Sequence, residues 1–435
     1  MKKNFLIIMS VVLAVMCVLT ACNAEKNPEE TVAEEESTAT ENAADAALLV
    51  NGIDIAEYTV VYDGRISVGS ETAMKHFNSK LKQQYKIELA ATTNSSDGYR
   101  IFIGVKNTDS VISAFYDSCE EGMIGFDGEN IYLLAKNNGG LYTVIDAFFA
   151  KMVSTGERDE ITVSENEKVA FTKDSLTVMS YNVLYDIEGR DVTALANFIK
   201  EQNADVFGTQ ETKRVHKDAI LAAMPNYDCY EGVVLKGGYE LQNMIFWNAD
   251  KYKAVSKGFQ YLTDTPFVAS KIEESNSYRG FTYVVLESLA TQKQFLFVDV
   301  HLTYRDSDGE AGGEKVKQAR LKQAQYLVKF LEEKKYETMP IILVGDFNSV
   351  PNSEALNAVD SSKRIDRTAI IANTKGDLGG TTTRNVRSIR DTYVFDHIFV
   401  TSDRISTEYY TAINYKENGK FPSDHLPVLA KIVIY

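Results

Sequence analysis

The stretch IILVGDFNSV, residues 341–350, contains the clearest structural signal in the chain. Its branched apolar run is typical of a short strand buried in a core. Asp346 and Asn348 follow at once, and their polar groups are costly to bury without hydrogen-bond partners. A single junction of this kind is more often a turn or a helix cap, so its meaning depends on the rest of the chain.

The same arrangement recurs at other strand ends downstream of Ser175. Polar residues end or follow candidate strands in SYNV, GTQET, VDVHL, FDHIFV and PSDHLPV. With residues 341–350 included, the polar residues in chain order are Asn182, Gln210, Glu211, His301, Asp346, Asn348, Asp396, Asp424 and His425. Three of the five histidines in the chain lie in these junctions. This coincidence predicts one shared site.

Between the junctions, strand candidates alternate with amphipathic helix candidates. DVTALANFIKEQ places Val192, Leu195 and Ile199 on one helical face, and EKVKQARLKQAQYLVKFLEE predicts a longer helix. Neighbouring strands combined with helical crossovers predict a layered α/β sandwich.

Taken together and in this order, the motifs resemble those of the endonuclease/exonuclease/phosphatase superfamily, which includes deoxyribonuclease I. The resemblance covers residues 174–435 and runs through SYNV, QE, VDVHL, GDFN, an Asp with hydrophobic neighbours, and SDH before a last apolar strand. It implies a four-layer α/β sandwich in which strand-end loops gather the catalytic residues at one rim. It also implies a metal-dependent hydrolase of phosphate esters.

The resemblance assigns a role to each junction residue. Glu211 is the principal ligand of Mg²⁺, with Mn²⁺ as the alternative ion, and Asn182 and Asp424 are its partners. Such oxygen ligands suit a hard cation. His425 is the general base, oriented by Asp396.

On the substrate side, Asp346 and Asn348 position the water and the phosphate in this resemblance. His301 contacts the phosphate or assists the leaving oxygen, and Gln210 is a positioning residue. Asn243 in LQNMIFWN is a candidate substrate contact, although packing at a strand edge explains it equally well. His397 alternates away from Asp396 along its strand and is interpreted as structural.

Arginines provide further candidate substrate contacts. Arg320 lies on the apolar stripe of the long helix, where the alternative is a buried stem with a solvated head. Arg384 and Arg387 lie in GGTTTRNVRSIRDTY just before the Asp396 strand. That segment is either a solvated loop or a loop that binds phosphate.

The first residues, MKKNFLIIMSVVLAVMCVLTAC, combine two lysines with an apolar run, which is typical of an export signal over residues 1–21. The end of the run, Leu19-Thr20-Ala21-Cys22, resembles the lipobox of bacterial lipoproteins. That resemblance implies lipidation of Cys22 and anchoring at the outer face of the bacterial cell membrane; the alternative is an ordinary signal peptide. Residues 22–48 are acidic and lack aromatics, and are predicted to form a disordered tether.

Residues 49–172 predict a smaller N-terminal α/β domain. ETAMKHFNSKLKQQY places Met74, Phe77, Leu81 and Tyr85 at helical spacing, and GMIGFDGENIYLLAK predicts a hairpin. The order resembles the small α/β domain that precedes the catalytic barrel of hexosaminidases and α-glucuronidases. No catalytic cluster occurs in this region, so either a spacer role or binding of a glycan or protein partner fits.

The chain has a net charge of −15, and residues 174–435 are themselves net negative, which disfavours duplex nucleic acid as the substrate. The sequence therefore predicts a cell-surface phosphoesterase that cleaves phosphodiesters. The alternatives are a phosphomonoesterase acting on inositol or sugar phosphates, a nuclease, and a surface binding protein without catalysis.

Overall fold

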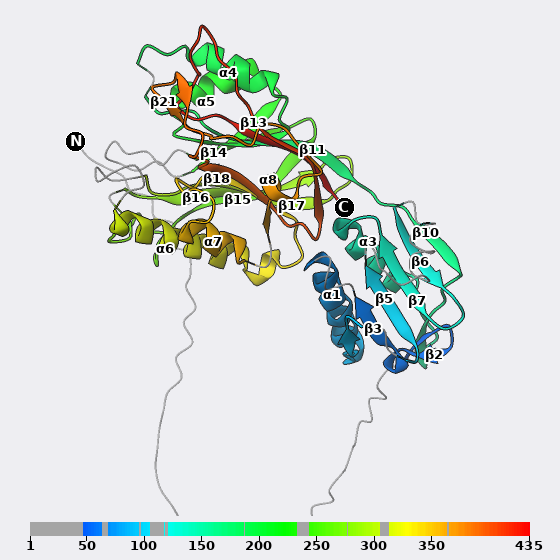
Figure 1. Ribbon diagram of the computed structural model, residues 1–435. Helices are drawn as coiled ribbons and strands as arrows, with labels where there is room; N and C mark the ends of the chain where they lie inside the picture. Colours follow the sequence, from blue (N-terminus) through cyan, green and yellow to red (C-terminus); the bar gives the residue numbers. More distant parts are fainter. Residues whose placement is uncertain are drawn as a thin grey trace, which may run out of the picture. The chain divides into compact units, whose positions relative to one another are not determined.

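The computed structural model describes residues 47–62, 68–94, 97–104, 117, 121–186, 188–232, 243–275, 277–304, 313–362 and 365–435 (Figure 1). The predicted export signal, Cys22 and all but the last residues of the predicted tether lie outside this part of the chain. Among the described helices, none combines the length and the apolar character that crossing a membrane requires.

The N-terminal part is a small α/β region with its own core. Its helices, of which η1 is a 3-10 helix, are η1 Ile55–Glu57, α1 Val68–Tyr85 and α3 Asn138–Ala150. Its strands are β1 Ala47–Val50, β2 Ile53–Asp54, β3 Thr59–Tyr62, β4 Ala91–Thr92, β5 Arg100–Gly104, β6 Gly122–Phe126, β7 Ile131–Ala135, β8 Val153–Ser154, β9 Arg158–Ile161 and β10 Asn166–Val169. They form a six-stranded sheet, β10-β6-β7-β5-β3-β4, and a four-stranded sheet, β2-β1-β9-β8.

The predicted helical face and hairpin both occur in this region. Phe77 and Leu81 of α1 are fully buried in the core that α1 and α3 share with the larger sheet. Strands β6 and β7 pair in antiparallel fashion, and Gly128 between them has φ +101°, which favours glycine.

The C-terminal part contains two central sheets. The first has the order β13-β14-β12-β11-β25-β24-β20 and the second β15-β16-β17-β18-β23-β19. Strands of the first are β11 Asp174–Asn182, β12 Val206–Gln210, β13 Tyr227–Glu231, β14 Met244–Asn248, β20 Thr374–Lys375, β24 Ile405–Ala412 and β25 Val428–Ile434. Strands of the second are β15 Tyr252–Tyr261, β16 Gly280–Ser288, β17 Gln294–His301, β18 Ile341–Asp346, β19 Asp366–Arg367 and β23 Asp396–Val400. A separate hairpin consists of β21 Thr383–Arg384 and β22 Ser388–Ile389.

Helices cover the outer faces of both sheets, which makes four layers (Figure 1). The helices, with η2 a 3-10 helix, are α4 Val192–Glu201, α5 Arg214–Ala223, α6 Glu314–Leu331, η2 Lys334–Tyr336, α7 Glu354–Asp360 and α8 Thr368–Ile371. Leu195 and Ile199 of α4 share a core with Phe207 of β12, whereas Leu327 of α6 shares a core with Leu343 of β18. A third core, which includes Val178 and Val344, lies between the two sheets. The predicted four-layer α/β sandwich is confirmed.

Strand pairing explains why the polar junctions come together. In the first sheet β11 runs parallel to β12, so Asn182 pairs with Gln210 at their carboxyl ends. In the second sheet β17 runs parallel to β18 and pairs His301 with Asp346. Strand β23 runs antiparallel to β18, so its first residue, Asp396, also pairs with Asp346. Parallel strands end at the same sheet edge, and an antiparallel neighbour begins there.

The approach to this edge requires special backbone. Gly345 has φ +154°, and a Cβ at this position would lie 2.1 Å from the carbonyl oxygen of Val300. Glu211 and Asn348 have φ of 59° and 47°, values that non-glycine residues adopt rarely and often at functional sites. The turn after each strand therefore redirects a polar side chain toward the same place.

Candidate active site

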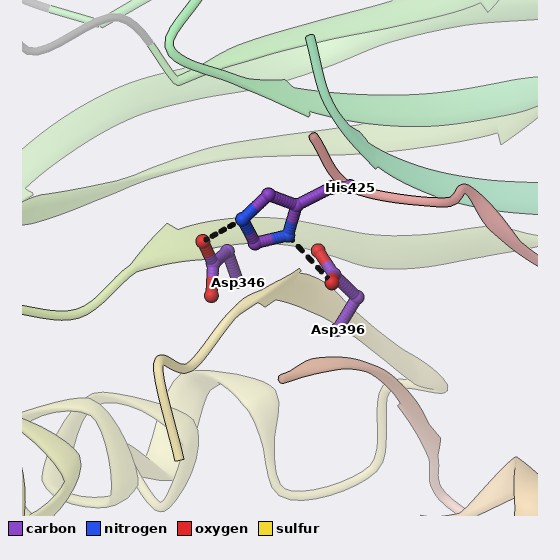
Figure 2. Close-up of side chains that lie close together, drawn as sticks. All are labelled: Asp346, Asp396 and His425. Atoms are coloured by element: carbon purple, nitrogen blue, oxygen red, sulfur yellow. Dashed lines mark hydrogen bonds and ion pairs between the residues drawn. The ribbon is translucent and has the colours of Figure 1, made fainter. Parts of the chain in front are cut away.

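Three buried side chains form the centre of the candidate site: Asp346, Asp396 and His425 (Figure 2). His425 Nδ1 lies 2.8 Å from Asp396 Oδ2, and His425 Nε2 lies 3.7 Å from Asp346 Oδ2. One ligand atom from each of the three lies within 4.8 Å of the others. The Nδ1–H bond to Asp396 fixes the tautomer and leaves Nε2 as the nitrogen that can accept a proton.

Electrostatics in this cluster favour a protonated imidazole. Burial opposes the charge on His425, but the carboxylates of Asp396, Asp346 and Asp424 outweigh it and hold its pKa well above the usual range. Burial and the nearby Asp396 raise the pKa of Asp346, although His425 acts in the opposite direction. The cluster therefore contains more negative than positive charge.

Glu211 extends the cluster on the side of the first sheet. Asn182 Nδ2 donates to Glu211 Oε1 at 3.2 Å and to Asp346 Oδ2 at 3.0 Å, which ties the two sheets together at the site. The backbone N–H of Tyr185 donates to Glu211 Oε2 at 3.0 Å. Burial, with a contribution from Asp424, raises the pKa of the Glu211 carboxyl.

This donor set fits a divalent cation. Glu211, Asp346, Asp396 and Asp424 supply carboxylate oxygens in a largely buried space, and His425 and Arg279 offset only part of their charge. Hard cations such as Mg²⁺ and Mn²⁺ prefer such oxygens. Asn182 Oδ1 accepts the backbone N–H of Leu184 at 3.0 Å, so its amide holds two carboxylates and the following turn in register.

His301 and Asn348 lie on the other side of Asp346. His301 Nε2 is 3.1 Å from Asn348 Nδ2 and 3.5 Å from Asp346 Oδ2. Burial holds the pKa of His301 well below the usual range, so the ring is neutral. Asn348 Nδ2 also donates to the carbonyl oxygen of Leu302 at 3.1 Å, which fixes the amide facing the histidine.

Arg279 is a site residue that the sequence interpretation missed. Its Nη1 lies 3.4 Å from His301 Nδ1, and its buried Nε has no hydrogen-bond partner within the described residues. Burial lowers the pKa of the guanidinium, while the charges of Glu211 and Asp346 oppose that change. Arg279 immediately precedes β16, whose Phe281 pairs with Val300 of β17, so antiparallel register places it beside the end of β17. Only a correct strand pairing could have revealed it.

Both ring nitrogens of His301 thus face donors, Asn348 Nδ2 on one side and Arg279 Nη1 on the other. A neutral imidazole accepts a hydrogen bond at only one nitrogen. At least one of the two donors therefore has an N–H group that His301 does not accept.

The remaining predicted residues are distributed around two cavities and the core. Arg320 and Asn348 line a cavity of about 330 Å³ together with Tyr393 and Phe395. Arg384 lines a second cavity of about 560 Å³ that reaches Asp424 and His425. Arg387 is exposed and is not among the lining residues described for either cavity.

Two predicted residues lie behind the site. Asn243 is buried, and its Nδ2 donates to the backbone carbonyls of Gly280 at 3.1 Å and Asp299 at 3.4 Å. These bonds agree with the packing alternative for this residue. Gln210 Nε2 donates to Asp299 Oδ1 at 2.6 Å, and burial raises the pKa of Asp299 well above the usual range. Both residues link the two sheets beneath Glu211 and His301.

His397 points away from the carboxylate cluster, as alternation along β23 predicts. Its ring packs against Phe347 and Phe399, and its Nε2 donates to the carbonyl oxygen of Ser349 at 3.3 Å. Its contacts are those of a structural residue.

Comparison with known proteins agrees with this geometry. The family model described as "Endonuclease/Exonuclease/phosphatase family" matches residues 179–425. An endonuclease/exonuclease/phosphatase family protein from Bacteroides thetaiotaomicron is 25% identical over 61% of this chain and 100% of its own, with a TM-score of 0.53. A mannosyl-6-phosphatase from B. thetaiotaomicron VPI-5482 is 24% identical over 59% and 99%, with a TM-score of 0.50.

A functionally unknown protein from Enterococcus faecalis V583 shares the same fold at 20% identity, with coverage of 60% and 100% and a TM-score of 0.52. Among curated proteins no match is found. The family match spans more than half of the chain and includes every junction from Asn182 to His425. The chain belongs to the endonuclease/exonuclease/phosphatase family and is a hydrolase that acts on phosphate ester bonds.

Proposed function

We propose that this protein is a metal-dependent phosphoesterase that hydrolyses phosphodiesters. The observation that carries the proposal is the Asp396–His425 pair at 2.8 Å, with Nε2 of the histidine on the side of Asp346. This pair provides an oriented base next to a cluster of carboxylates with excess negative charge. A bound Mg²⁺ or Mn²⁺ would offset that charge and polarise the phosphoryl group.

The base in this proposal is His425. In the neutral ring, which a cation bound among the carboxylates would favour by offsetting their charge, Nε2 takes the proton from the attacking water. Asp396 holds the ring and stabilises the imidazolium that forms. Glu211 and Asp424 would hold the cation, and Asn182 keeps Glu211 and Asp346 in place. Asp346 also accepts a hydrogen bond from the water, which orients the lone pair of the oxygen toward phosphorus.

On the opposite side, Asn348, His301 and Arg279 face the phosphoryl oxygens and the leaving oxygen. An N–H group of Asn348 or Arg279 that His301 does not accept stabilises negative charge as it develops. Asn348 and His301 are buried and Arg279 is partly buried, which restricts their movement before the substrate arrives. The leaving oxygen departs from this side, in line with the water held by His425.

These residues could act on a phosphomonoester in the same way. The diesterase and monoesterase activities are therefore distinguished by assaying a matched diester and monoester. Purified protein is assayed with bis(p-nitrophenyl) phosphate and with p-nitrophenyl phosphate at equal concentrations in Mg²⁺ and in excess chelator. The proposal expects faster turnover of the diester and loss of both reactions in chelator. Faster turnover of the monoester supports the monoesterase alternative, and full activity in chelator contradicts metal dependence.

Anchoring at Cys22 belongs to the same proposal. The lipobox-like LTAC and the acidic residues 22–48 support an enzyme tethered to the outer face of the bacterial membrane. Cys22→Ser is expected to release the protein from the membrane fraction into the medium or the soluble fraction. An unchanged membrane association of that variant contradicts the anchor.

A further inference from the structure

The cavity of about 560 Å³ has a wall whose charge differs from that of the candidate metal site. Arg190, Arg384 and Arg390 line it together with Asp424 and His425. The carboxylates Glu211, Asp346 and Asp396 are not among its lining residues. The wall is therefore mainly basic, whereas the carboxylate cluster that adjoins it at Asp424 and His425 is acidic, and each suits a different part of a substrate.

The wall is fixed relative to the proposed base by backbone hydrogen bonds. The N–H of Thr383 donates to the carbonyl oxygen of Asp424 at 2.7 Å, and the N–H of Leu426 donates to that of Thr381 at 2.7 Å. Thr382 and His425 form an isolated antiparallel bridge between these bonds. The hairpin that begins at Thr383 is thus joined directly to the segment that carries His425.

Hairpin register places two of the arginines on one face. Arg384 pairs with Ser388, and the N–H of Arg390 donates to the carbonyl oxygen of Thr382 at 2.8 Å, which continues the same pairing. Side chains of directly opposite residues project from the same face, and so do those two positions apart on one strand. Arg384 and Arg390 therefore share the face of Thr382.

The hairpin turn and Arg190 are both held by the same neighbouring segment of the chain. Asn385 and Val386 have φ of 51° and 52°, the pattern of a type I′ turn, which is costly for a β-branched residue. The Val386 carbonyl accepts the N–H of Phe421 at 2.9 Å, and Arg190 Nη1 donates to the carbonyl of Pro422 at 3.2 Å. One short segment, Phe421–Pro422, thus holds both the strained turn and Arg190.

We propose that this basic wall binds a second phosphate group of the substrate, distinct from the phosphate that reacts. This inference rests on the proposed function, in which the reacting phosphate is served by the metal site, Asn348 and Arg279. Among the described residues that line the cavity, three carry a guanidinium group and one carries a carboxylate, and the planar guanidinium matches phosphate oxygens in a bidentate manner. The substrate class is therefore a small phosphate ester with at least two phosphate groups.

The size of the cavity agrees with that class. A volume of about 560 Å³ lies within the range of pockets that enclose small molecules. A duplex tracked by its backbone would require basic residues spread along a face rather than three around one cavity. Tyr304 and Phe395 also line the cavity, and they offer apolar surface to the group that connects the two phosphates.

Direct binding tests the inference separately from catalysis. Calorimetry in excess chelator compares fructose 1,6-bisphosphate with fructose 6-phosphate as probes, at fixed ionic strength, with ³¹P spectra to verify that both stay intact. The bisphosphate is expected to bind at least about tenfold more tightly, since each bidentate pair adds more than a simple charge contact. Equal affinities for the two probes would overturn the inference, whatever the enzyme hydrolyses.

Variants locate the second phosphate. Arg384→Ala and Arg390→Ala are each expected to lose most of the preference for the bisphosphate over the monophosphate. Arg384→Lys keeps the positive charge but not the planar guanidinium, and is expected to retain part of this preference. Arg387→Ala removes the same charge from the same hairpin at an exposed position outside the lining residues, and is expected to change the preference less than about twofold. An equal loss of the preference in Arg387→Ala would show that the overall positive charge of the hairpin, and not a specific binding site, attracts the second phosphate. Thermal melts verify that each variant is folded.

Discussion

His425 Nδ1 and Asp396 Oδ2 lie 2.8 Å apart, with both side chains buried and with Asp396 at the first position of β23. The second oxygen of Asp396, Oδ1, is buried without a hydrogen-bond partner among the described residues. The imidazole is thus the one described partner of this carboxylate. The position of Asp396 fixes Nδ1 as the nitrogen that it binds and leaves Nε2 on the side of Asp346. Catalysis should depend on this pair as a unit.

The first prediction concerns that pair. Asp396→Asn keeps the size of the side chain but removes the charge that stabilises the imidazolium, so kcat is expected to fall at least about 100-fold. His425→Ala should fall by a similar factor, and the double variant should lose little more than either alone. Steady-state kinetics of the three proteins measure this. Additive losses of kcat in the double variant would contradict the assignment. An equal loss of kcat in a control such as Asp366→Asn on β19 would contradict it as well.

The sequence motifs predict the four layers and the meeting of the two sheets at one edge through the family that they resemble. Asn182, Glu211, His301, Asp346, Asp396 and His425 each lie at a strand end or in the turn beside it. Strand pairing gathers them at the edge of each sheet, and packing of the two sheets brings the two edges together. Apolar runs identify strands because burial of their side chains selects them. For this reason the junctions can be recognised in the sequence alone.

Other parts of the site depend on information that no local pattern contains. Arg279 becomes a neighbour of His301 only through the register of β16 with β17. Arg384 and Arg387 look equivalent in the sequence, but the turn at Asn385 and Val386 separates them, and only Arg384 lines the cavity. Whether Asn243 faces a substrate or the backbone likewise depends on partners that are distant in the sequence.

The second prediction concerns the cation. Loss of even an outer partner of a metal ligand weakens binding 10- to 100-fold, so Glu211→Gln is expected to weaken Mn²⁺ binding at least about 100-fold. Electron paramagnetic resonance of free Mn²⁺ measures this without any turnover. Glu408→Gln, at an exposed position of β24, is the matched control and should bind as the wild type does. Unchanged Mn²⁺ affinity in Glu211→Gln would show that the ion, if bound, lies elsewhere.

The third prediction concerns stability at low pH. Burial lowers the pKa of His397 from 6.5 to about 4, although the carbonyl of Ser349 acts in the opposite direction. Between these values the unfolded chain binds a proton that the folded protein does not. The contribution of His397 to the free energy of unfolding therefore falls as the pH falls from 6.5 to 4, by up to about 1.4 kcal/mol per pH unit.

Urea unfolding of wild type and His397→Gln at several pH values in this window tests that linkage. The glutamine can still donate to Ser349 but does not titrate, so the variant should show a shallower loss of stability on acidification. Burial also lowers the pKa of His216 to about 4, so the His397→Gln variant should keep part of the dependence of stability on pH. Identical slopes in the two proteins would show that His397 is already protonated, or accessible, in the folded state.

The last prediction concerns Arg279. Its guanidinium faces His301 with an Nε that has no partner among the described residues, and Glu211 and Asp346 contribute to its electrostatic surroundings. If it stabilises charge on the phosphoryl oxygens, Arg279→Ala should lower kcat by about 10²- to 10³-fold, the loss typical of a removed transition-state donor, with a smaller change in KM. Arg279→Lys should recover little, because an ammonium cannot present the same planar fork.

Chemical rescue separates this role from a structural one. Added guanidinium ion can occupy the space left in Arg279→Ala and should raise its kcat in a saturable manner, while methylammonium should have a weaker effect. Melting temperatures with and without the added ion verify that the rescue is not a gain in stability. A folded Arg279→Ala protein with near wild-type kcat would exclude Arg279 from catalysis. A deficient variant that guanidinium cannot rescue would indicate that the arginine acts by holding His301 in position.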